Sequence, residues 1–200
     1  MTSNHYAPKS CAVGGCTHNA LTRADTCWEH LPNKPEFIEN FANQPWADAW
    51  LAGIDLSGQS LEGINLSGAR LSGANLSHAN LRKANLRRTF LDGAALTGAD
   101  LSEADLEFAV LGAACVTDAK FISANLQRAN LVGTKGHRAD FSRANLYYSR
   151  PGNSDFTEAS FAGANIQRAI FRRAKLTGAN LSGTTGQANF ENADLTGVRR

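Results

Sequence analysis

The sequence predicts an all-β solenoid, and a five-residue period between residues 51 and 181 is the main reason. Stepping by five from Leu51 to Leu181 gives 27 central positions, of which 24 are Leu, Phe or Ile. The residue two places before the centre is Ala in 20 of these 27 repeats. A period of five matches neither a helix nor an ordinary strand. Short fixed periods are typical of solenoids, in which each repeat contacts mainly its neighbours.

Each repeat needs only two inward residues, a large one and a small one, to fill a narrow interior at protein density. Clear copies are Ala74-Asn75-Leu76 and Ala124-Asn125-Leu126. The pattern resembles the pentapeptide repeat family. That resemblance implies a right-handed quadrilateral β-helix with four repeats per coil, here about seven coils over residues 51–200. The pattern is interrupted by Gly136 and Pro151 at central positions and by a phase slip between Leu181 and Phe190.

Four repeats per coil place residues 20 apart above one another, about 4.8 Å apart as in paired strands. Phe121, Phe141 and Phe161 are then expected to stack inside the solenoid as core. Leu101 is expected to point inward and Ser102 outward. One outward column is expected to hydrogen-bond along the stack and at the turns; it contains Asn65, Asn85, Asp105, Asn125, Asn145 and Asn165.

Residues 1–32 have a different composition and are predicted to form a small zinc-binding segment. Cys11-x4-Cys16-x10-Cys27-x2-His30 has the ligand types and ordered spacing of small Cys3His zinc knuckles. Four protein ligands leave no open coordination position, so the predicted Zn²⁺ is structural. The alternatives are four unrelated residues or an inert thiol cluster, and His18 could replace His30 as a ligand.

Residues 33–50 are predicted to be a capping helix and linker. Pro35 at a first helical position, with Phe37 and Phe41 four apart, indicates a short amphipathic helix. Trp46 and Trp50 follow it. A solenoid must cover its open end, so we interpret this segment as the N-terminal cap of the third segment, residues 51–200. A ligand-binding aromatic box is the alternative interpretation.

Charge and hydropathy exclude several classes of protein. The formal net charge is +2, and residues 46–200 carry 17 Lys or Arg and 14 Asp or Glu without a strongly acidic or basic face. There is therefore no strong nucleic-acid signal. No apolar run is long enough for a membrane span. Residues 1–6 lack the features of a signal peptide, so we expect a cytoplasmic protein with reduced cysteines.

One outward edge departs from the polar pattern, because two neighbouring columns interleave arginines with apolar side chains. Aromatic residues and Arg are enriched at interaction hot spots, so this edge is the predicted partner-binding surface. The alternative is a self-satisfied cation–π ladder. Pro151 is expected to cause a bulge beside it. The predicted edge residues are Arg88, Phe90, Phe108, Val110, Arg128, Tyr148, Arg168 and Ile170.

The sequence predicts a non-enzymatic scaffold that binds a protein of unknown identity, with a homodimer as one form of this partner. No nucleophile, base or phosphate-binding motif occurs at a recognisable spacing. Lone Cys115, beside Lys135, is interpreted as incidental. The family resemblance implies an alternative, because some members mimic duplex DNA and bind DNA gyrase. That mimicry uses an acidic surface, and the balanced charge of this chain counts against it.

Overall fold

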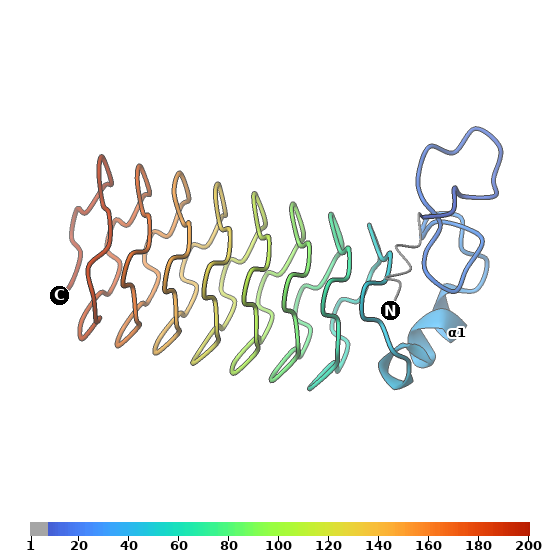
Figure 1. Ribbon diagram of the computed structural model, residues 1–200, viewed down its shortest axis with the longest axis horizontal. Coiled ribbons are helices and arrows are strands. Elements are labelled where there is room, and N and C mark those ends of the chain that lie inside the picture. The colour runs from blue at the N-terminus through green and yellow to red at the C-terminus, as the bar shows by residue number, and fades with distance from the viewer. Residues whose placement is uncertain (1–7) are drawn as a thin grey trace, which may run out of the picture.

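The computed structural model describes residues 8–200. The expectation that residues 1–6 are not a signal peptide therefore concerns residues outside the described part of the chain. The chain begins with a loop-rich segment, followed by helix α1 (Lys34–Glu39) and the short 3-10 helix η1 (Phe41–Asn43). From residue 50 onward it winds into a solenoid, with the two helices at one end (Figure 1). Within residues 8–200 no helix has the length and apolar character needed to cross a membrane.

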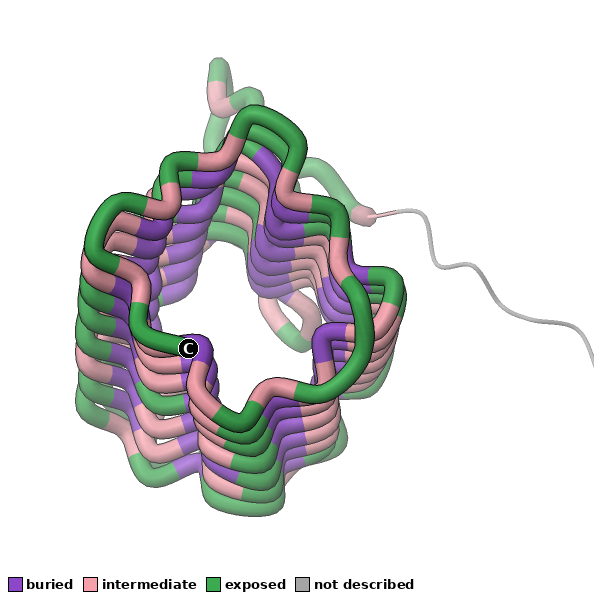
Figure 2. Tube along the Cα trace, turned by 90° about the vertical axis from the view of Figure 1, so that its left-hand side faces the viewer, coloured by how far each residue is buried: buried purple, intermediate pink, exposed green. Residues whose placement is uncertain are grey.

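The solenoid is held together by parallel pairings between residues 20 apart. Trp50 pairs with Arg70 and Arg70 with Phe90, and three further ladders start at Asp55, Ser60 and Asn65. Each rung is a single residue, so no extended strand forms. The ladders give the coil four sides when it is viewed along its axis (Figure 2). The spacing predicted from the sequence is therefore the spacing of the inter-coil hydrogen bonds.

The large central residues fill the interior, and all 27 from Leu51 to Leu181 are buried. Phe121, Phe141 and Phe161 stack with ring centroids 4.7 and 5.0 Å apart, as predicted. Gly136 fits the same interior because of Phe156. A Cβ at Gly136 would lie only 2.5 Å from the Phe156 ring, so that ring occupies the space of the missing side chain.

Every repeat turns through a residue with positive φ, located two places after the centre. From residue 53 to residue 183 all 27 of these residues have φ between +54° and +71°, and 16 of them are not glycine. Positive φ costs an ordinary side chain free energy that glycine does not lose. The arginines and aromatics at this position therefore occupy a conformation that their own side chains disfavour.

Two expectations about individual residues were wrong. Ser102 does not point freely outward: it is 3% exposed and its N–H donates to Asp100 Oδ1. Pro151 causes no bulge, because it is buried and the turn to Asn153 keeps the standard φ of +54°. The Arg150 and Ile170 N–H groups still donate to the neighbouring coils at 2.9 and 3.0 Å. Proline lacks an N–H, so it contributes no donor of its own to the ladder.

The phase slip near the C-terminus is a deletion of one residue from the last coil. Ile170 pairs with Asn189 and Lys175 with Asp194, which is a step of 19 instead of 20. Phe190 thereby stacks on Phe171, with ring centroids 5.1 Å apart. The deletion therefore places Phe190, rather than the residue after it, over the central residue of the preceding coil.

Four repeats replace the small inward Ala with a buried hydroxyl. Thr89, Thr134 and Ser154 each donate to the carbonyl 23 residues earlier, at 2.8, 2.9 and 2.6 Å. Ser149 is equally buried, but its hydroxyl has no hydrogen-bond partner among the described residues. Three of the four buried hydroxyls therefore have a carbonyl of the preceding coil as hydrogen-bond acceptor, as is usual for buried polar groups.

The N-terminal end of the solenoid is covered by aromatic side chains. Phe41 and Trp46 are 1% and 2% exposed and belong to the same buried cluster as Leu51. Trp46 stacks on Phe41 at 4.3 Å, and its ring N–H donates to the Phe41 carbonyl at 2.6 Å. Trp50, in contrast, is only half-buried and occupies the first rung of a ladder.

Candidate functional site

The four predicted zinc ligands converge on one point. The ligand atoms of Cys11, Cys16, Cys27 and His30 all lie within 4.8 Å of one another. His30 Nδ1 is 3.4 Å from both Cys11 Sγ and Cys27 Sγ, and Cys16 Sγ is 3.9 Å from Cys27 Sγ. Ligands around a tetrahedral Zn²⁺ lie roughly 3.5–3.8 Å apart, given metal–ligand distances of about 2.1–2.3 Å. The cluster therefore has the size of a Cys3His zinc site.

Local backbone structure accounts for this convergence. The first two cysteines flank a tight loop in which Cys16 N–H donates to the Val13 carbonyl, and Gly15 has a φ of +79°. The Cys11 N–H donates to the His18 carbonyl at 3.0 Å and closes the loop as a small antiparallel hairpin. A second turn, in which the His30 N–H donates to the Cys27 carbonyl at 3.2 Å, aligns the other two ligands.

Hydrogen bonds to the sulfur atoms favour a thiolate at this cluster. The N–H of Cys27, with smaller contributions from the Val13 N–H and His30, lowers the pKa of Cys11 to about 6. At Cys16 the His18 N–H acts to lower the pKa, but burial and the neighbouring Cys11 and Cys27 thiols raise it overall. Crowded thiols resist ionising together, and a bound divalent cation removes that penalty.

His18 is not part of the inner cluster. Its side chain is exposed on the outside of the segment, where Nδ1 lies 3.6 Å from Glu29 and 3.8 Å from Cys16 Sγ. His30 is the histidine that joins the three cysteines. The structure therefore favours the first ligand set predicted from the sequence over the one with His18.

The ligand cluster is connected to the solenoid through the loop between Cys16 and Cys27. Thr22 N–H donates to the Trp50 carbonyl, and Trp50 N–H donates to Thr22 Oγ1, both at 2.8 Å. Arg23 lies over the Trp46 ring at 5.4 Å. This loop thus adds a partial rung before the first coil.

The predicted partner-binding residues lie along one side of the solenoid, and we call them the arginine–aromatic edge. The eight residues come from two neighbouring columns, and their rings are covered by guanidinium groups. Arg88 and Arg128 lie 5.8 and 5.3 Å from the Phe108 ring, one coil before and one coil after it. Arg168 lies 5.0 Å from the Tyr148 ring and donates to its hydroxyl. The cation–π ladder considered from the sequence is therefore present, whether or not a partner binds.

The edge begins earlier than the sequence analysis placed it. Arg70 lies between Trp50 and Phe90, 4.7 and 4.5 Å from their rings. The 20-residue period gives the signal, since Trp50, Arg70 and Phe90 share one ladder. Interpreting Trp50 as part of the cap hides this signal in the sequence. Phe90, Phe108 and Val110 are half-buried, whereas Tyr148 and Ile170 are exposed, at 38% and 41%.

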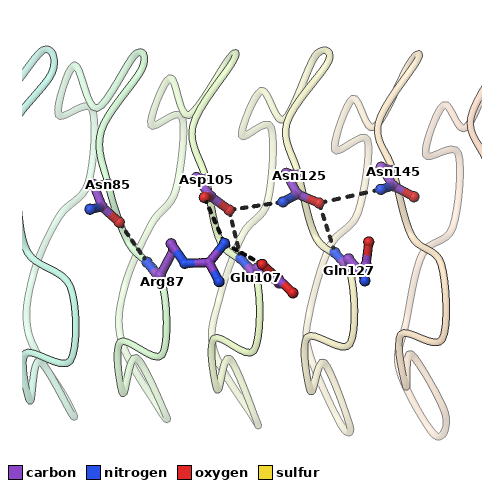
Figure 3. A network of polar contacts seen from close by, with 7 residues as sticks. All are labelled: Asn85, Arg87, Asp105, Glu107, Asn125, Gln127 and Asn145. Atoms are coloured by element: carbon purple, nitrogen blue, oxygen red, sulfur yellow. Dashed lines mark hydrogen bonds and ion pairs between the residues drawn. The ribbon is translucent and has the colours of Figure 1, made fainter.

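The neighbouring Asn column is structural. Asn125 Nδ2 donates to Asp105 Oδ1 at 2.9 Å, and Asn145 Nδ2 donates to Asn125 Oδ1 at 3.3 Å (Figure 3). The Asn125 side-chain oxygen also accepts the Gln127 N–H, which closes the turn. Arg87 pairs with Asp105 and with Glu107 beside this ladder. Because these side chains satisfy one another, the column offers few free groups to a ligand.

Cys115 is half-buried beside the Lys135 rung, as expected. Burial acts to raise its pKa, but hydrogen bonds from Thr97 and Thr117, together with the Lys135 charge, lower the pKa overall. No other His, Cys, Asp or Glu side chain joins it in a metal-sized cluster among residues 8–200. Nothing therefore assigns it a ligand.

Comparison with known proteins identifies the repeat. A family model described as pentapeptide repeats matches residues 51–88, 79–118, 114–149 and 153–185. The chain is similar to the solved structure of HetL, a pentapeptide repeat protein involved in heterocyst differentiation regulation from the cyanobacterium Nostoc sp. strain PCC 7120. The identity is 28%, the TM-score is 0.54, and the match covers 82% of this chain and 91% of HetL.

A second similar structure is QnrB1, a plasmid-mediated fluoroquinolone resistance protein. It is 19% identical, with a TM-score of 0.51, and the match covers 74% of this chain and 86% of QnrB1. Identity this low shows a shared fold alone. No curated protein matches the chain. The N-terminal segment, with its four candidate ligands, lies outside the residues that the family model matches.

Proposed function

Because the chain belongs to the pentapeptide repeat family, we propose that it is a non-enzymatic scaffold that binds another protein through the arginine–aromatic edge. One observation carries the proposal. Among the described residues only Val13, Tyr148 and Ile170 are large apolar side chains with substantial exposure, and two of these three lie on this edge. Folding does not require a polar solenoid wall to expose them, whereas binding interfaces commonly use such residues.

The test compares two sets of substitutions in a cross-linking experiment. Tyr148→Ser with Ile170→Ser removes both exposed apolar groups of the edge. Ile122→Ser, a half-buried position in an outward column that does not belong to the edge, serves as the control. The edge variant is expected to lose a discrete cross-linked partner, or the homodimer in light scattering, at nearly unchanged melting temperature. Retention of the same partner by both variants would show that the edge does not bind it.

We further propose that Cys11, Cys16, Cys27 and His30 bind a structural Zn²⁺ that holds residues 1–32 together. The support is that the four ligand atoms lie within 4.8 Å of one another, in a segment with little apolar core. Zinc released after thiol modification is expected at one equivalent per chain. Cys27→Ala should abolish this release and make residues 1–32 sensitive to protease, while residues 51–200 remain resistant. Full protection of the N-terminal segment without metal would contradict the proposal.

Residues 33–50 are proposed to cap the solenoid of residues 51–200. The buried Phe41–Trp46 pair, which contacts the same core cluster as Leu51, supports this role. The cap would protect the interior and the unpaired backbone of the first coil from solvent.

Mimicry of duplex DNA toward gyrase is the alternative function. The likeness to QnrB1 shows only a common fold, and the edge of this chain carries arginines where a DNA mimic would present carboxylates. A supercoiling assay with gyrase and a fluoroquinolone separates the two functions. The scaffold proposal expects no protection of gyrase at any ratio of protein to enzyme, whereas protection would favour the alternative.

A further inference from the structure

We infer that the arginine–aromatic edge recognises an acidic, extended segment of its protein partner, an inference that rests on the proposed scaffold function. The edge is more basic than the whole-chain charge of +2 suggests. Its two columns contain five arginines and no Asp or Glu between residues 68 and 170. These arginines are Arg70, Arg88, Arg128, Arg150 and Arg168.

None of these five guanidinium groups forms an ion pair within residues 8–200. The arginines that do are Arg82, Arg87, Arg138 and Arg172, which lie in other columns beside carboxylates. Four of the five edge arginines are exposed, and Arg70 is half-buried. The edge therefore presents unneutralised positive charge, which favours a negatively charged partner.

The packing of the rings distinguishes between two kinds of anionic partner. Single-stranded nucleic acid is normally bound by stacking bases on open aromatic faces. Here the Phe108 ring has Arg88 on one side and Arg128 on the other, and Arg168 covers the Tyr148 ring. Stacked guanidinium groups keep outward N–H donors, which match the two oxygens of a carboxylate. The edge is thus better suited to acidic side chains than to bases.

The length of the edge indicates how much partner chain it can contact. Arg88, Arg128 and Arg168 are two coils apart, or about 10 Å at the spacing of paired strands, so the row is about 19 Å long. An extended peptide of roughly six residues spans this distance. Tyr148 and Ile170 at one end of the row supply apolar contacts for such a segment.

The experiment measures binding of a fluorescein-labelled twelve-residue oligoglutamate peptide by anisotropy at low salt, with oligo-dT of equal length as the competing probe. The test variant combines Arg88→Gln, Arg128→Gln and Arg168→Gln. The control combines Arg138→Gln, Arg143→Gln and Arg173→Gln, which occupy the same positive-φ position of the repeat on other columns. Both variants remove three charges at positions with the same positive-φ backbone, and Gln keeps the Cβ that Arg has there, so circular dichroism should report equal folding.

The expected result is that the test variant weakens peptide binding about tenfold or more, while the control changes it less than about twofold. Added salt should weaken wild-type binding. Equal losses in both variants, no binding of the peptide, or tighter binding of oligo-dT would each overturn the inference. If the arginine variant keeps the cross-linked partner that the Tyr148→Ser with Ile170→Ser variant loses, the acidic partner is wrong and the scaffold function stands.

Discussion

Ser149 and Ser154 occupy the small inward position of adjacent repeats, and they differ in one respect. The Ser154 hydroxyl donates to the Leu131 carbonyl and receives the Thr134 N–H, whereas the Ser149 hydroxyl has no partner among the described residues. A buried hydroxyl without a hydrogen bond costs free energy, whereas a paired one contributes modestly to stability. The same substitution should therefore have opposite effects at the two sites.

We predict that Ser149→Ala raises the free energy of unfolding by about 1 kcal/mol, because it removes an unpaired polar group and restores the common Ala of the repeat. Ser154→Ala is expected to lower it by about 1 kcal/mol, because it removes the hydroxyl hydrogen bonds with the Leu131 carbonyl and the Thr134 N–H, which stay paired with each other at 3.1 Å. Denaturant titration of both variants measures the difference. Similar destabilisation by both would show that Ser149 has a partner in solution.

Individual residues also show where sequence reasoning stops. The period alone predicted that Leu101 lies inside, and it is fully buried. It could not predict the burial of Ser102, because the same turn hydrogen bond leaves Ser57 exposed and Ser142 half-buried, so the repeat itself does not determine burial at this position. Nor could it predict that Gly136 is compensated by Phe156, which follows one coil later, since the period gives stacking order without the direction of a ring.

At the scale of one element, the Asn column combines two functions in each side chain. Asn125 closes its own turn through the Gln127 N–H and links two coils by donating to Asp105. Asn125→Asp would keep the first contact, lose the second, and place a carboxylate beside Asp105. Asn125→Ala would lose both contacts and also the hydrogen bond from Asn145 Nδ2, and it would add no charge.

We predict that Asn125→Asp lowers the free energy of unfolding by about 1–3 kcal/mol at pH 7. Repulsion from Asp105 raises the pKa of the introduced carboxyl in the folded state above its unfolded value. The folded state then binds a proton more readily, so the loss should shrink as the pH falls toward about 4. Asn125→Ala should show a loss that does not change with pH relative to wild type. Thermal melts from pH 4 to 7 measure both, and a loss for Asn125→Asp that is independent of pH would contradict the ladder geometry.

For the N-terminal segment, the sequence predicted which residues come together as metal ligands but not the backbone structure that positions them. Ordered spacing indicated Cys11, Cys16, Cys27 and His30, and the structure brings these four together. The choice between His30 and His18 depended on the hairpin that orients Cys16, which spacing alone does not define. The attachment of Thr22 to Trp50 also had no sequence signal, because a contact across 28 residues outside the repeat follows no period.

For the whole molecule, periodicity predicted the architecture but not the partner. A solenoid of this kind repeats its interior, so composition at every fifth residue is enough to identify it. Its outer columns vary freely, and function depends on which side chains happen to align there. The alignment of Arg88, Phe108 and Arg128 was readable from the 20-residue coil. The period did not show that both guanidinium groups lie over the Phe108 ring, because it gives the order of side chains in a column without their conformations.

The last prediction concerns how the molecule unfolds from its covered end. Trp46 is 2% exposed and stacks on Phe41 over the first coil, whereas Trp50 is half-buried at the rim. Trp46→Ala removes about 3–5 kcal/mol of packing from that end. Because solenoid repeats interact mainly with their neighbours, the loss should be local.

Amide hydrogen exchange is expected to accelerate over residues 48–70 and to stay unchanged over residues 111–150. Trp50→Ala should have a smaller effect over the same residues, since its side chain lies outside the core. Uniform acceleration along the whole solenoid would mean that the coils unfold as one cooperative unit, and that the aromatic cover stabilises all of them equally.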